Sequence, residues 1–161
     1  MKRLALIVER FGPMLLALGC ALLLVWQRTA ITQAYKDDAV DFAALYGAVL
    51  DWSAIQTGFL FGIFGYVAGK NDGFVAALKD TPEMALFTGY MKWAIVFGFA
   101  LTVTSIPLII FRFSIGSGED WKYLTFVAWS ALAIWGFLAF ARVAYIFGII
   151  VRVKDQVRIP G

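Results

Sequence analysis

A few polar side chains stand within long apolar stretches of the chain, and these are the residues best placed to act on ions. Asp51, Gln56 and Thr57 lie in one such stretch together with Gly58 and Gly62. A carboxylate, an amide and a hydroxyl beside glycines that allow close backbone approach could line a pore or form its gate. The same groups could instead join helices inside one subunit, because polar groups in hydrocarbon must find partners. Both interpretations stay open on the sequence.

Arg142 and Lys92 are the cations within apolar stretches. An unpaired charge at the centre of a bilayer costs at least about 2.5–3.5 kcal/mol, so such side chains usually meet a partner or water. Lys92 could simply extend its amine to the interface. Arg142 is followed by the apolar run 144–151, so a submerged Arg142 would indicate a solvated cavity or an anion path. We count it with Asp51 as a candidate for the pore or its gate.

Other charged residues gather outside the apolar stretches. Asp51 could pair with Arg28 or Arg112. Three aspartates could attract cations to an outer mouth, although a solvated loop is the simpler interpretation: Asp37, Asp38 and Asp41. Basic residues that could meet a phosphate-bearing ligand or a cytosolic partner, or serve only as orientation signals near anionic lipid, are Lys70, Lys79, Lys92, Arg152, Lys154 and Arg158.

The sequence contains few residues that could support enzyme catalysis. Histidine is absent and Cys20 is the only cysteine, so one chain cannot assemble a Cys- or His-based metal site or an internal disulfide. We find no nucleophile with a neighbouring base and no glycine-rich phosphate loop. The sequence therefore predicts no enzyme, no catalytic residues, no metal and no cofactor.

Four long apolar segments must position the candidate residues. The chain has 161 residues, of which 61% are hydrophobic and 16% charged, whereas soluble domains are roughly half apolar and one quarter charged. A membrane helix needs roughly 20 apolar residues, and four such spans are expected at about 11–27, 46–69, 86–113 and 121–151. We predict an all-α integral membrane protein with four transmembrane helices in a single domain.

Local signals mark several ends of these helices. Thr81 and Pro82 form a typical cap and first residue of a helix, and Pro107 predicts a kink near the far end of the third span. The segment 70–73 is a turn signal. Residues 28–44 are expected to form a polar loop with room for a short surface helix.

Lysine and arginine placement predicts that both termini are cytoplasmic. With the N-terminus inside, the inner segments hold eight Lys and Arg, the outer loops hold four, and Lys92 and Arg142 lie within spans. We therefore expect a multi-pass membrane protein with this orientation.

Small residues recur on one face of the second span at spacings of three or four: Gly47, Asp51, Ala54, Gly58, Gly62, Gly65 and Gly69. Such a face allows close helix packing, either inside one subunit or between subunits. A second row on the third span is expected to pack in the core: Ala94, Gly98, Thr102 and Ser105.

One bundle of four helices has a core filled with side chains, so conduction requires several copies around an axis. We therefore favour a homo-oligomeric bundle that acts as a membrane channel or a membrane-perturbing effector. The alternative is an accessory membrane subunit of a larger transporter or respiratory complex, which would show the same features.

The layout, with the stretch Ile55-Gln56-Thr57-Gly58-Phe59-Leu60-Phe61-Gly62 and the turn Lys70-Asn71-Asp72-Gly73-Phe74, resembles small four-span membrane effectors of bacterial antiphage defence systems of the Hailong or Kiwa type. The resemblance covers the plan of the whole chain. It implies a homo-tetramer or similar assembly in the bacterial inner membrane, acting as a channel or sensor under the control of a nucleotide ligand or a cytosolic protein. It transfers no individual residue role to this sequence.

Overall fold

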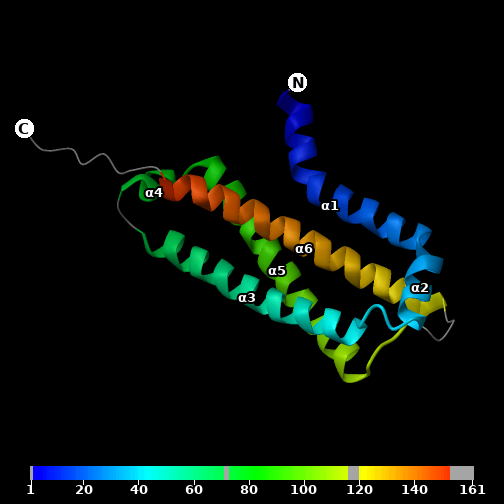
Figure 1. Ribbon diagram of the computed structural model, residues 1–161. Helices are drawn as coiled ribbons and strands as arrows, with labels where there is room; N and C mark the ends of the chain where they lie inside the picture. The colour runs from blue at the N-terminus through cyan, green and yellow to red at the C-terminus, as the bar shows by residue number, and fades with distance from the viewer. Residues whose placement is uncertain (1, 71–72, 116–119, 153–161) are drawn as a thin grey trace, which may run out of the picture.

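The computed structural model describes residues 2–70, 73–115 and 120–152, and side chains from residue 11 onward except those of residues 73 and 74. Within these ranges the chain is helical almost throughout, as predicted, and forms no strand. The helices in chain order are α1 (Lys2–Trp26), α2 (Arg28–Lys36), α3 (Phe42–Gly69), α4 (Gly73–Leu78), α5 (Pro82–Ile110) and α6 (Asp120–Arg152) (Figure 1).

Three of these helices, α3, α5 and α6, are long and apolar enough to cross a membrane. A fourth span results if Phe11–Trp26 of α1 and the adjoining α2, which meet at 66°, are counted as one bent unit. The all-α prediction is thus confirmed with three to four candidate membrane helices. The segment expected as a loop at 28–44 contains α2, and α3 begins at Phe42, four residues before the predicted position.

Side-chain caps explain where two of the long helices begin. The Thr81 hydroxyl accepts a hydrogen bond from Met84 N at 3.3 Å, and Pro82 is the first residue of α5, as predicted. The Asp41 carboxylate accepts from Ala43 N at 2.9 Å and so caps α3. An oxygen at this position satisfies an amide that has no partner inside the helix.

The long helices run alternately in opposite directions, with α2 at one end of the molecule and α4 at the other (Figure 1). Helix α6 lies between α1 and α3 in this view, and α5 packs against both α3 and α6. Helix α1 packs on α6. The faces of α1 and α3 that point away from α6 therefore lie on different sides of the subunit.

Two apolar clusters fill the interior near the two ends of the helices. Rings dominate the cluster towards α2: Phe42, Tyr46, Leu101, Leu108, Ile115, Tyr123, Phe126, Val127 and Trp129. Aliphatic side chains and methionines dominate the cluster towards α4: Leu60, Ile63, Val67, Val75, Met84, Phe87, Met91, Ala94 and Val143. The subunit thus has a core filled with side chains at both ends.

A layer of polar and small residues separates the two clusters. Ser53 Oγ lies 2.8 Å from Thr102 Oγ1, which joins α3 to α5. Gln56 Nε2 donates to the carbonyl oxygen of Gly136 at 3.3 Å, which joins α3 to α6. We call this the polar layer and define it by Ser53, Gln56, Thr57, Gly98, Thr102 and Gly136.

Gly98 sets how closely α3 and α5 approach in the polar layer. A Cβ at residue 98 would lie 2.3 Å from Thr57 Oγ1, which is far inside van der Waals contact. Gly98 is buried together with Ala94 and Ser105, so the row expected to pack in the core does so. The contact between α3 and α5 at this point is therefore made by the Thr57 hydroxyl and the bare backbone of Gly98.

We predict that Gly98→Ala destabilises the subunit by about 1–3 kcal/mol, because the added methyl group forces Thr57 or the helix backbone to move. Gly148→Ala on α6 is the matched control, since residue 148 is exposed and a Cβ there meets nothing within 4 Å. Adding Thr57→Ala to Gly98→Ala should recover part of the loss. Unfolding of the purified protein in detergent measures all three, and equal stability of G98A and G148A would contradict the prediction.

Candidate functional site

The predicted glycine face of α3 lies on the outside of the subunit. Gly58, Gly62, Gly65 and Gly69 are exposed, and a Cβ added at any of them would meet nothing within 4 Å. The close contacts of α3 inside the subunit use the opposite side of the helix. The sequence left two interpretations of this face open, packing within one chain and packing between chains. In the structure, this face does not pack against other helices of the same chain.

Aromatic side chains border the glycine face on both sides. Phe59 packs on Phe140 of α6 with ring centroids 5.8 Å apart, and Phe61 packs on Phe99 of α5 with centroids 6.1 Å apart. These edge-to-face contacts hold the rings over the neighbouring helices. The backbone between them is therefore left uncovered by side chains of the subunit.

Asp51 is exposed and continues the glycine face towards the α2 end of α3. The pairing of Asp51 with Arg28 that we considered is not present, because Arg28 forms an ion pair with Asp120. No ion pair of Asp51 occurs among the described residues. A carboxylate thus faces outward next to a row of glycines.

Gln56 and Thr57 point into the subunit and do not share the face of Asp51, Gly58 and Gly62. Gln56 is 2% exposed and Thr57 is 7% exposed. The Thr57 hydroxyl donates to Ser53 O at 2.7 Å, and Gln56 Nε2 donates to Gly136 O. The candidates for a pore or gate therefore divide into an outward group and an inward group, and within the inward group Gln56 joins α3 to α6.

Arg142 lies apart from both groups. Its guanidinium stacks on the ring of Tyr90, with the central carbon 3.9 Å from the ring centroid, and the side chain is half-buried between α5 and α6. Lys92 is exposed on α5, as expected for an amine that extends to the interface. Neither cation lies in the polar layer.

The basic candidates for a ligand or partner lie at the α4 end of the molecule. Lys79 Nζ donates to the carbonyl oxygen of Ala68 at 3.0 Å, which ties the turn between α4 and α5 to the end of α3. Lys70 is half-buried and Arg152 is exposed at the last turn of α6. Lys154 and Arg158 lie outside the described residues.

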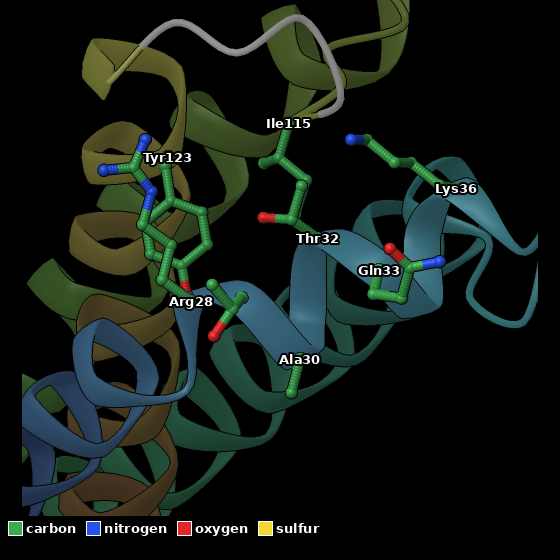
Figure 2. Close-up of a pocket in the computed structure, with 8 residues that line it drawn as sticks. Arg28, Ala30, Thr32, Gln33, Lys36, Ile115 and Tyr123 are labelled. Atoms are coloured by element: carbon green, nitrogen blue, oxygen red, sulfur yellow. The ribbon is translucent and has the colours of Figure 1, made fainter.

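The opposite end, where Figure 2 shows the pocket lined by Arg28 and Tyr123, contains an ion pair that sequence reasoning missed. Arg28 pairs with Asp120 and its guanidinium lies 5.3 Å from the ring centroid of Tyr123, whose hydroxyl donates to Leu24 O. A hollow of about 610 Å³ opens between α2 and this corner, with Gln33 among its lining residues. Arg28 and Asp120 are 92 residues apart, so no local pattern in the sequence signals the pair.

The aspartates proposed as an outer mouth have local partners. Asp37 accepts from Gln33 Nε2 at 2.9 Å, and Asp41 caps α3. Asp38 has a positive φ of 52° in the turn between α2 and α3. Among the described residues no group of Asp, Glu or Cys side chains is arranged to hold a metal ion.

Comparison of the chain with protein-family models, with curated proteins and with solved structures found no significant match.

Residues of the outward group should react faster with a water-soluble reagent than residues of the inward group. In a Cys20→Ala background we predict that Asp51→Cys reacts with a water-soluble maleimide at least about tenfold faster than Gln56→Cys, because a fully buried thiol requires local opening. Stopped labelling and mass spectrometry of the purified protein measure both rates. Equal rates for the two variants would mean that Gln56 also faces an open surface.

Proposed function

We propose that the chain is the subunit of a homo-oligomeric channel or membrane-perturbing effector of the bacterial inner membrane, with four spans and both termini in the cytoplasm. The observation that carries the proposal is the outward position of Asp51, Gly58 and Gly62 on α3. Neither the carboxylate nor the bare glycine backbone is suited to contact with lipid tails.

The free energy of this face in a bilayer depends on what covers it. Lipid gives no hydrophobic drive for helices to associate, so packing against small residues and polar contacts must supply it. A copy of α3 placed on the glycines gains close backbone contact that an acyl chain cannot match. Asp51 on the same face then meets water or polar groups of the other copies, which avoids the cost of a carboxylate in hydrocarbon.

An ion path must run between copies because the interior of one subunit is filled. The two apolar clusters and the polar layer occupy the space among α3, α5 and α6. Copies arranged around an axis, in a tetramer or a similar ring, would bring several Asp51 carboxylates to the mouth of a shared path. Rings of carboxylates favour cations.

Control by a cytosolic nucleotide or protein partner, as in antiphage defence, is the regulatory part of the proposal. The basic residues at the α4 end, which include Lys70, Lys79 and Arg152, would face the cytoplasm and attract phosphates or an acidic surface. These residues lie at the same end of the subunit as Gly69, the last residue of the glycine face. A partner bound there would act directly on the end of α3.

The second candidate is an accessory membrane subunit of a larger transporter or respiratory complex. The same exposed face of α3 favours it, because a helix of a large partner would cover the glycines equally well. Purification from native membranes separates the two. A stoichiometric large partner favours the accessory subunit, and a complex of identical chains favours the channel.

Cysteine crosslinking tests whether copies meet at the glycine face. In a Cys20→Ala background we expect Gly62→Cys to form disulfide-linked dimers under mild oxidation in membranes. Leu16→Cys on α1, which is 59% exposed on a different side of α6, is the matched control and should stay monomeric. Equal dimer yields at both positions would reject a specific interface along α3.

Conduction is the direct test of the activity. Purified protein in planar bilayers should pass current, and Asp51→Asn should reduce the preference for cations because each copy loses one negative charge near the path. Ser53→Ala, which alters an inward side chain two residues away, should leave selectivity unchanged. A silent preparation that is also monomeric would exclude the channel.

A further inference from the structure

A groove of about 490 Å³ runs along the subunit between α1, α5 and α6. Its volume is in the range of small-molecule sites, which are roughly 300–1,000 Å³. Most of the lining is apolar, and the side chains that matter most here are Met14, Tyr90, Trp93, Phe97, Trp135 and Arg142. The glycine face of α3 does not take part in this groove.

Arg142 supplies the only charge among the described residues that line the groove. Its guanidinium is held parallel to a surface rather than extended, because it stacks on Tyr90 at 3.9 Å. A stacked guanidinium keeps its N–H donors at the edge of its plane, the geometry in which arginine binds phosphate by two hydrogen bonds. This groove therefore joins an anion-binding group to a long apolar wall.

The depth of Arg142 fits the boundary between headgroups and acyl chains. Helix α5 has 29 residues, about 43 Å of helix against a hydrocarbon core of about 30 Å. An even overhang leaves about 6 Å outside the core at each end. Tyr90 is eight residues into α5, about 12 Å, so Arg142 lies about 6 Å below the boundary, within snorkelling reach of a lipid phosphate.

From Arg142 the groove extends in the direction that an acyl chain of a bound lipid would take. Phe97 lies one to two turns deeper than Tyr90 on α5, and Trp135 lies seven residues from Arg142 on α6, about 10 Å. Trp135 packs on Phe97 with ring centroids 4.5 Å apart. The apolar wall thus continues from the guanidinium towards the middle of the membrane.

Two features of the backbone keep the groove open. The first part of α1 turns away from the other helices (Figure 1), and Pro13, which lies within α1 and lines the groove, removes a helical hydrogen bond as kinking prolines do. On α5, a Cβ added at Gly89 would meet nothing within 4 Å. The space beside Tyr90 is therefore unfilled by the subunit.

We propose that this groove binds one phospholipid with an anionic headgroup, its phosphate at Arg142 and one acyl chain along Trp93, Phe97 and Trp135. A free nucleotide or phosphate would use the charge but would leave the apolar wall without a ligand. A neutral lipid would use the wall and gain less from the guanidinium. An anionic lipid of the leaflet at this end of α5 uses both.

The test is lipid titration of the delipidated protein in detergent, followed by native mass spectrometry. We expect the wild type to bind phosphatidylglycerol more tightly than phosphatidylcholine with the same acyl chains. Arg142→Gln should weaken phosphatidylglycerol binding by about tenfold, since a charged hydrogen-bonded pair is lost, and should remove the preference. Lys36→Gln removes one positive charge from an exposed position at the opposite end of the molecule and should change binding less than about twofold.

Gly89→Leu provides a second variant that keeps every charge. Its side chain fills the groove beside Tyr90, so binding of both lipids should weaken while Arg142 remains. Equal phosphatidylglycerol binding by wild type, R142Q and G89L would overturn the proposal. Complete displacement of the lipid by millimolar inorganic phosphate would also overturn it, because the ligand would then be a free anion.

Discussion

The close approach of α3 and α5 at Gly98 determines how the rest of the subunit is arranged. Thr57 occupies the space that a side chain at residue 98 would need, and Ser53 and Gln56 reach α5 and α6 on the same side of α3. These polar groups gain partners only when this side of α3 faces inward. Because side chains three or four residues apart share a helix face, the rotation that buries Ser53, Gln56 and Thr57 turns Gly58 and Gly62 outward.

The outward position of the glycines is a consequence of this rotation of α3. Helix α3 has apolar residues all round, so burial of apolar surface alone would allow several rotations in a membrane. Polar contacts remove that freedom, since the Gln56 amide turned towards lipid would lose its partner on α6. The cost is a surface that lipid covers poorly, with Asp51 at one end. In the assembly that we propose, a second copy of α3 covers this surface.

The sequence was sufficient to predict the helical class, the start of α5 at Thr81 and Pro82, and the row of small residues on α3. It could not decide which side of α3 faces inward, because glycines suit packing within a subunit and between subunits equally well. The decisive signal was the position of Ser53 and Gln56, which hydrogen-bond to other helices, and of Thr57, which fills the space beside Gly98. Long-range pairs such as Arg28 with Asp120 leave no periodic trace, and the same is true of the Arg142–Tyr90 stack.

The two surfaces for which we propose ligands are joined through α6. Gly136 accepts the hydrogen bond of Gln56 in the polar layer, and Arg142 lies six residues further along the same helix, about 9 Å. A lipid that fixes Arg142 against Tyr90 would therefore hold α6 to α5 close to the point where both meet α3. The rotation of α3 depends on that meeting point. Lipid on one side of the subunit and assembly on the other would then be coupled by the packing of one helix, without a contact between the two surfaces.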